Sequence, residues 1–194
     1  MPRYFIVHKP YGVLSQFTRE IPEHRVLGDL FQFPSNVYPV GRLDRDSEGL
    51  LIVSDDKKLN NQLLNPKFAH QRTYWVQVDG QITPEAVQQL TDGVTIRINK
   101  KDYHTKPAQA ALLSPISALP ERDPPIRFRK NIPTSWISLS LTEGKNRQVR
   151  RMCAKVGFPV LRLIRMEMEN LRLQAFIPGK VVEMSKEEVY AMLF

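Results

Sequence analysis

Short apolar runs separated by turn residues recur along the chain and predict a series of β-strands. The predicted strands cover residues 4–7, 50–53, 73–78, 94–98, 110–113, 136–141 and 160–166. The first is stopped by the turn sequence Lys9-Pro10-Tyr11-Gly12. In residues 73–78, Tyr74, Val76 and Val78 lie on one face and Trp75 and Gln77 on the other, an alternation that is typical of a half-buried strand.

Helical spacing of apolar residues predicts helices at residues 57–64, 84–90 and 146–156, and a shorter one at 26–33 that ends before Pro34. The acidic stop at residues 54–56 could cap the first, and Thr83 followed by Pro84 is a favourable start for the second. Apolar side chains of the third recur at i, i+3, i+4 and i+7: Val149, Met152, Cys153 and Val156.

Strands and helices do not alternate regularly, which favours an α+β fold with a mixed, largely antiparallel sheet and flanking helices. Residues 114–133 hold five prolines and are the least periodic part, so we expect a long surface loop or insertion there. With 194 residues, the chain is expected to be a single domain over residues 1–194, in which two sub-lobes could share one sheet.

The net charge of +8 is weak evidence for a polyanionic partner, but its distribution is informative. Residues 142–165 hold seven Lys/Arg and one acid, whereas residues 1–60 hold eight of each sign. This basic stretch suits contact with nucleic-acid phosphates. No apolar run is long enough to span a membrane, and the N-terminal residues lack the pattern of a secretory signal.

The single cysteine, Cys153, cannot form an internal disulfide, and this fits a cytoplasmic location. The four histidines do not have the spacing of metal ligands, so no metal site is expected.

Asp44 is the most notable polar residue between two apolar runs. It lies in a glycine-bounded loop beside Arg42 and Arg45, whose guanidinium groups would keep its carboxylate ionised and able to act as a nucleophile. An ordinary turn aspartate has the same surroundings, and spacing alone favours that simpler interpretation.

Three motifs change this judgement. They are KPYG at residues 9–12, GRLDRDSEGLL at 41–51 and GKNRQVRRM at 144–152. In this order the chain resembles the RsuA-like family of rRNA pseudouridine synthases, and the similarity continues through residues 157–165. The resemblance implies the pseudouridine synthase fold, with a central active-site cleft.

The resemblance also assigns roles to individual residues. Asp44 would be the catalytic nucleophile, Tyr74 the tyrosine that stacks on the target base, and Arg150 the basic partner of the catalytic aspartate. Arg42 would contact the flipped-out nucleotide, and Val149 would pack beneath its base. The remaining expected substrate-binding residues are Lys145, Arg147 and Arg151, whose alternative is a solvated helix surface.

Residues 13–18 and 123–136 resemble segments of the branch that modifies 23S rRNA, which makes that RNA the expected partner. The first strand begins within five residues of the start, so no N-terminal S4 RNA-binding domain is expected. The reaction implies no cofactor and no metal, and we expect a monomer that binds neither DNA nor membrane. Whether Asp44 attacks C1′ or the path begins at C2′ stays open, as does the identity of the uridine.

Two other classes of protein fit less well. A non-catalytic RNA-binding or ribosome-assembly protein would have no chemical reason to keep Asp44, Tyr74 and Arg150 together. A methyltransferase would need a glycine-rich nucleotide-binding turn, and the sequence contains no G-x-G-x-x-G.

Overall fold

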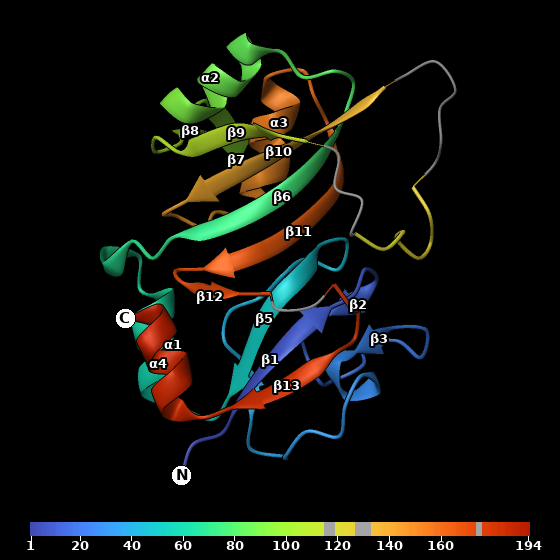
Figure 1. Cartoon of the computed structure of the whole chain (residues 1–194), viewed down its shortest axis with the longest axis vertical. Coiled ribbons are helices and arrows are strands. Elements are labelled where there is room, and N and C mark those ends of the chain that lie inside the picture. Colours follow the sequence, from blue (N-terminus) through green and yellow to red (C-terminus); the bar gives the residue numbers. More distant parts are fainter. Residues whose placement is uncertain (115–118, 127–132, 174–175) are drawn as a thin grey trace. The chain divides into compact units, whose positions relative to one another are not determined.

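The chain forms two compact units, each built from strands and helices (Figure 1). A computed structural model describes residues 1–114, 119–126, 133–173 and 176–194. Unit 1 comprises Met1–His70 with Arg165–Phe194, and unit 2 comprises Gln71–Ile164. The strand pairing is mostly antiparallel, so the predicted α+β class with a mixed sheet is confirmed.

The sheet of unit 1 is centred on β1 (Tyr4–Lys9), which pairs antiparallel with β5 (Glu48–Ser54) on one side and β13 (Val181–Met184) on the other. All residues of β1 and β5 are buried, the predicted apolar runs at 4–7 and 50–53 together with polar residues at the strand ends. The short strand β4 (Tyr38–Pro39) also pairs with β5, and β12 (Leu171–Arg172) pairs with the end of β11 (Val160–Met168).

One carboxylate, that of Asp56, joins three elements of unit 1. It caps α1 (Lys57–Leu64) by accepting hydrogen bonds from two backbone N–H groups of the first turn, which confirms the predicted helix start. Its Oδ2 also accepts the hydroxyls of Tyr4 on β1, at 2.6 Å, and of Tyr190 on α4 (Lys186–Leu193), at 2.8 Å. Burial and these bonds to Asp56 raise the pKa of Tyr190 to about 12.

The prediction of a helix at residues 26–33 was wrong. Residues Arg25–Val26 form β3, parallel to β2 (Val13–Leu14), and only Leu27–Asp29 form a single 3₁₀ turn. The following phenylalanines instead pack on the ring of Phe5, with centroids at 5.8 Å for Phe31 and 5.4 Å for Phe33. Aromatic packing on the sheet therefore replaces helical hydrogen bonding after this turn.

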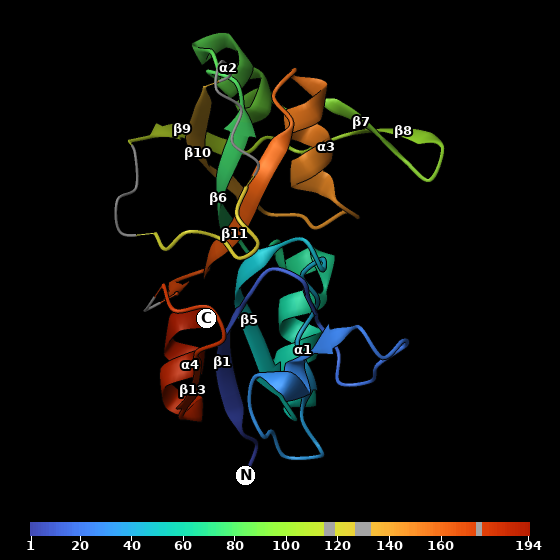
Figure 2. The same ribbon diagram turned by 90° about the vertical axis from the view of Figure 1, so that its right-hand side faces the viewer.

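The sheet of unit 2 joins strands that are far apart in sequence. β10 (Thr134–Leu141) lies between β6 (Arg72–Asp79) and β9 (Gln109–Leu113), antiparallel to both. β7 (Thr95–Ile98) and β8 (Lys101–His104) form a separate hairpin beside the helix α3 (Gln148–Lys155), as Figure 2 shows. The strand β8 was not predicted.

A side-chain cap and a left-handed residue set the starts of the two helices of unit 2. α2 (Pro84–Asp92) is capped by the Thr83 side chain and ends at Gly93, as predicted. α3 begins two residues later than predicted because Arg147 has a left-handed backbone, with φ of 50°, which cannot continue a right-handed helix. The described helices are eight or nine residues long, and none in the described ranges is long and apolar enough to cross a membrane.

The expected loop at residues 114–133 has no helix or strand in its described part, residues 114, 119–126 and 133. Arg122 holds this part by donating to the backbone oxygens of Pro124, at 2.8 Å, and Leu161, at 3.3 Å. Arg162 donates to the oxygen of Pro120 at 2.8 Å. The rest of the predicted loop, including most of the family-like segment 123–136, lies outside the described residues.

Gly49 on β5 provides a test of this packing. Its φ is +106°, and a Cβ at this position would overlap the backbone of Arg165. We expect Gly49→Ala to lower the free energy of unfolding by more than about 3 kcal/mol, measured by urea denaturation. Gly12→Ala is the control, because Gly12 also has a positive φ but open space around it, and it should lose only about 1 kcal/mol. Equal losses in both variants would contradict the steric argument.

Candidate active site

Asp44 lies in unit 1, in the loop between β4 and β5, and its neighbour Leu43 is held by one serine. The buried Ser15 hydroxyl accepts from the Leu43 N–H at 3.0 Å and donates to the Leu43 oxygen at 2.8 Å. Both backbone groups on the N-terminal side of Asp44 are therefore satisfied by a single side chain. Leu43 itself is buried, which anchors the loop to the core.

The C-terminal side of Asp44 is fixed by the first motif. The N–H of Gly12 donates to the oxygen of Arg45 at 2.8 Å, and Arg45 Nε donates back to the oxygen of Gly12 at 3.3 Å. A turn from the Asp44 oxygen to the Ser47 N–H, at 3.0 Å, closes the loop. The KPYG and GRLD motifs, about thirty residues apart, thus build one rigid turn that presents a half-buried Asp44.

Lys9 is a fully buried cation beneath this turn. Its Nζ donates to the oxygens of Val13, at 2.7 Å, and Pro10, at 2.9 Å, and lies 3.5 Å from the oxygen of Arg45. Burial lowers the pKa of Lys9 to about 7, although nearby carboxylates oppose this shift. Those carboxylates are Glu48, Asp46 and Asp44. The contacts of Lys9 join the first motif to the Asp44 turn from within unit 1.

Tyr74 and Val149 converge on one apolar cluster in unit 2. Val149, on α3, is buried with Met152 and Cys153, and Tyr74, on β6, is half-buried and packs against the same cluster. Tyr74 is therefore packed against this cluster while part of the residue stays accessible, and its stacking on a base stays a prediction.

Arg150 is half-buried on α3, one position past Val149, at the edge of the apolar face where the helical pattern placed it. Burial raises the pKa of the Cys153 thiol to about 12, and the positive charge of Arg150 acts in the opposite direction. Asp44 and Arg150 belong to different units, and their pairing stays a prediction.

The expected substrate-binding cations differ in their surroundings. Arg42 in unit 1, and Lys145 and Arg147 in unit 2, are exposed. Arg151 is half-buried: its guanidinium donates to the backbone oxygen of Arg97 and to the oxygen of Asn146 at 3.1 Å. Arg151 thus ties α3 to the β7–β8 hairpin, a role that its helical spacing did not indicate.

Glu143 is a site residue that the sequence analysis missed. This buried carboxylate accepts from the hydroxyl of Tyr103 at 2.5 Å, the N–H of Lys106 at 3.0 Å and Nε2 of Gln148 at 2.6 Å. Burial alone would raise the pKa of Glu143, but these hydrogen bonds lower it below its usual value. Its only sequence signal is its position directly before the GKNRQVRRM motif, as the one acid of a basic stretch.

Ser15 was also missed, because nothing in the sequence marks a serine that will meet a backbone 28 residues away. Within the described ranges, no group of three or more His, Cys, Asp or Glu side chains could hold a metal ion.

Residues 3–155 match the family model described as RNA pseudouridylate synthase. This match spans most of the chain and includes the Asp44 turn, Tyr74 and the basic motif before and within α3. The chain belongs to this family of enzymes, and it is an RNA pseudouridine synthase, an isomerase.

Individual proteins that are similar in sequence or structure are also pseudouridine synthases by name. The chain is 49% identical over 174 residues to ribosomal large subunit pseudouridine synthase E of Xanthomonas axonopodis pv. citri, covering 89% of each protein. It is 35% identical over 189 residues to ribosomal large subunit pseudouridine synthase B of Bacillus subtilis, covering 97% of this chain and 70% of that protein. A crystal structure of a pseudouridylate synthase shares the fold, with a TM-score of 0.79 at 22% identity over 100% of this chain and 74% of that one.

The buried amine of Lys9 predicts a pH dependence of stability. Its pKa is about 7 in the folded chain against 10.5 ordinarily, so between these values the unfolded state binds more protons. The free energy of unfolding should therefore rise with pH from about 7 to 10, by at most about 1.4 kcal/mol per pH unit. In Lys9→Met this contribution should be absent.

The measurement is urea denaturation of both proteins at pH 7, 8 and 9. The difference in unfolding free energy between wild type and Lys9→Met should grow in favour of wild type as pH rises. A constant difference across this range would show that Lys9 keeps an ordinary pKa.

Proposed function

We propose that this enzyme isomerises a specific uridine of 23S rRNA to pseudouridine, with Asp44 as its nucleophile. The names of the relatives from Xanthomonas and Bacillus support a large-subunit rRNA substrate. The observation that carries the assignment of Asp44 is its turn, in which the backbone is fixed on both sides by Ser15 and Gly12. A carboxylate on so rigid a support suits a reaction that requires accurate positioning.

The reaction exchanges one bond to the ribose for another. The C1′–N1 bond breaks, the base rotates and C1′ joins C5; the proton on C5 leaves, and N1 gains one. Asp44 attacks at C1′, or the path begins with loss of the C2′ proton, and in both cases no net oxidation occurs. We therefore propose that the enzyme works with neither cofactor nor metal.

The residues of unit 2 would act on the base and on Asp44. Tyr74 stacks on the target uracil and relays a proton, and Val149 forms the apolar surface beneath the base. Arg150 pairs with the Asp44 carboxylate and keeps it ionised. The packing of a half-buried Tyr74 against the cluster that holds Val149, and the half-buried position of Arg150 beside Val149 on α3, support this division of roles.

The exposed cations would bind the RNA backbone and the extruded nucleotide. A uridine in structured RNA must leave its stack to reach a carboxylate, so Arg42 is proposed to hold the flipped nucleotide or its phosphate. Lys145, Arg147 and Arg151 are proposed to contact or position phosphates.

RNA rather than DNA is the proposed partner because thymine carries a methyl group at C5, where the reaction must release a proton. We further propose that units 1 and 2 form a single catalytic domain, and that one chain acts alone in the cytoplasm.

Asp44→Asn tests the assignment directly. It keeps the size of the side chain but removes the nucleophilic carboxylate, so pseudouridine formation should be abolished while RNA affinity is largely retained. Release of tritium from 23S rRNA carrying [5-³H]uridine reports the exchange at C5. Asp92→Asn, at an exposed carboxylate on α2, is the control and should turn over normally. Normal turnover by Asp44→Asn would disprove the proposal.

Arg147→Asn tests the phosphate contact. Asparagine tolerates the left-handed backbone of this position, so the loop should keep its conformation. We expect weaker RNA binding, with the slope of log K against log salt concentration falling by about one unit. An unchanged slope, measured by filter binding between low and moderate salt, would return Arg147 to a solvated surface role.

A further inference from the structure

The tip of the β7–β8 hairpin has an unusual residue in a demanding position. Ile98 pairs with Lys101, so Asn99 and Lys100 form a two-residue turn, and their φ angles are 50° and 65°. Two-residue turns with positive φ at both positions prefer Asn followed by Gly, because a side chain at the second position is strained. The chain has lysine where the backbone would favour glycine.

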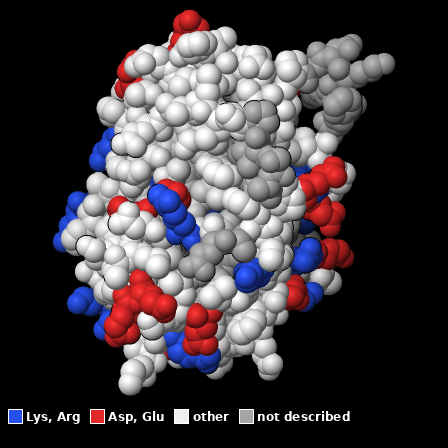
Figure 3. Space-filling model, in the orientation of Figure 1, with Lys and Arg blue, Asp and Glu red and all other residues white. Residues whose placement is uncertain are grey.

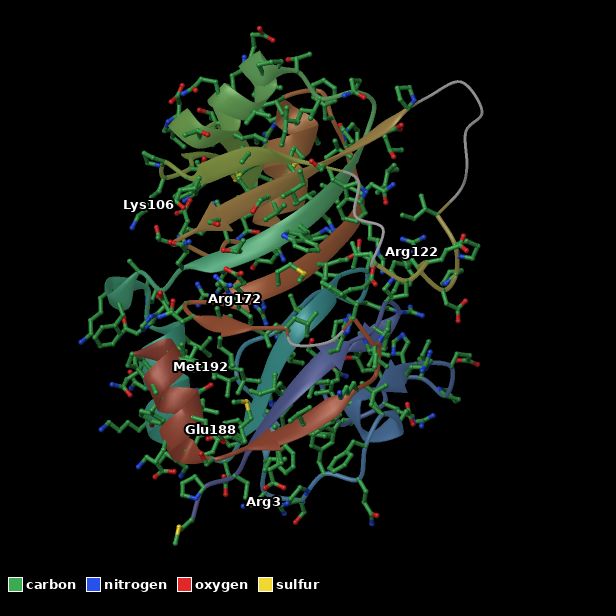
Figure 4. The ribbon with its side chains drawn as sticks, viewed as in Figure 1. Arg3, Lys106, Arg122, Arg172, Glu188 and Met192 are labelled. Atoms are coloured by element: carbon green, nitrogen blue, oxygen red, sulfur yellow. The ribbon has the colours of Figure 1, made fainter. Side chains whose placement is uncertain are left out.

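This lysine belongs to an exposed basic group that the catalytic assignment does not use. In residues 95–106 the cations are Arg97, Lys100, Lys101 and Lys106, and Asp102 is the one acid. All four cations are exposed, and Figure 2 shows the hairpin reaching outward past α3. Lys106, which follows the hairpin, points away from unit 2 in Figure 4.

The hairpin is fastened by three contacts within unit 2, two to the basic loop before α3 and one to α3 itself. Tyr103 of β8 donates its hydroxyl to the buried Glu143, and Nζ of Lys145 lies 4.8 Å above the Tyr103 ring. The Arg151 guanidinium donates to the backbone oxygen of Arg97 on β7. These contacts connect the element that carries the hairpin cations to the elements that carry Lys145 and Arg147.

Elsewhere on the protein, positive and negative side chains are mixed. On the face drawn in Figure 3, acidic residues of α4 lie next to basic side chains. Salt-dependent contact with a polyanion needs cations gathered without neighbouring acids, and the hairpin and loop satisfy this condition apart from Asp102.

We propose that the β7–β8 hairpin is a second RNA-binding element, in which Arg97, Lys100 and Lys101 contact phosphates beside the region where Lys145 and Arg147 bind. The partner is the sugar-phosphate backbone of the substrate RNA, away from the reacting nucleotide. This inference rests on the proposed RNA substrate. We attribute the presence of lysine at the strained turn position to this contact.

The central test is Lys100→Gly combined with Lys101→Ala. Glycine relieves the backbone at residue 100, so the melting temperature should stay unchanged or rise. At the same time kcat/KM for unmodified 23S rRNA should fall by roughly three- to tenfold, and the salt slope should fall by about one to two units. The turnover number at saturating RNA should stay at the wild-type value, because the hairpin does not touch the reacting atoms.

Two controls separate a specific contact from bulk charge. Lys57→Ala with Lys58→Ala removes two exposed cations from α1 in unit 1 and should leave kcat/KM unchanged. Asp102→Asn removes the one acid of the hairpin and should raise RNA affinity. A loss in the α1 variant equal to that in the hairpin variant would contradict the proposal, since it would indicate only an effect of net charge.

Failure of the hairpin proposal and failure of the proposed function would give different experimental results. If wild type modifies the RNA and the hairpin variant keeps its kcat/KM and salt slope, the hairpin is not an RNA contact, while the assignment of Asp44 stands. If wild type neither binds nor modifies 23S rRNA, both proposals fail. A hairpin variant that loses turnover at saturating RNA would also overturn the inference, because it would place the hairpin in the chemistry.

Discussion

The Asp44 turn depends on hydrogen bonds between backbone groups and a few side chains buried beneath it. A short polar loop has little apolar surface with which to hold its shape, so its peptide groups must find partners elsewhere. Ser15 satisfies both backbone groups of Leu43, and Gly12 pairs with Arg45, so the backbone is fixed on either side of Asp44. Lys9 completes this support from below, because its ammonium binds backbone oxygens of the first motif.

In unit 2 a buried carboxylate, that of Glu143, holds a polar loop in place, as the buried amine of Lys9 does in unit 1. The loop before α3 carries exposed cations that repel one another, and Glu143 binds this loop to Lys106 and Tyr103. Removing either buried charge would leave several polar groups without partners in a poorly solvated place, which costs more than the net value of each bond. Lys9 and Glu143 thus act in the same way: each is a buried ionisable side chain that fixes the backbone around residues proposed to act on the substrate.

Part of the fold could be predicted from the sequence, because helix caps and helix ends are marked by residues next to one another in the chain. The bounds of α1 and the cap and end of α2 followed from Asp56, Thr83 and Gly93. The capping box of α4, Ser185 with Glu188, was equally readable and was overlooked. The residues of the candidate site came from motif order, whereas Ser15 and Glu143 could not, since their roles depend on partners brought close only by folding. β8 escaped prediction because its sequence, Lys-Asp-Tyr-His, is polar and its strand character comes from pairing with β7.

The division of the chain into a continuous unit 2 and a discontinuous unit 1 has a consequence for synthesis on the ribosome. Residues 71–164 can complete their own core as soon as they have emerged. Unit 1 must wait for residues 165–194, and until β13 arrives β1 is an open sheet edge that could pair wrongly. During synthesis the middle of the chain, unit 2, can therefore fold before unit 1 is complete, while β1, the first strand to be made, is still exposed to chaperones and to other nascent chains.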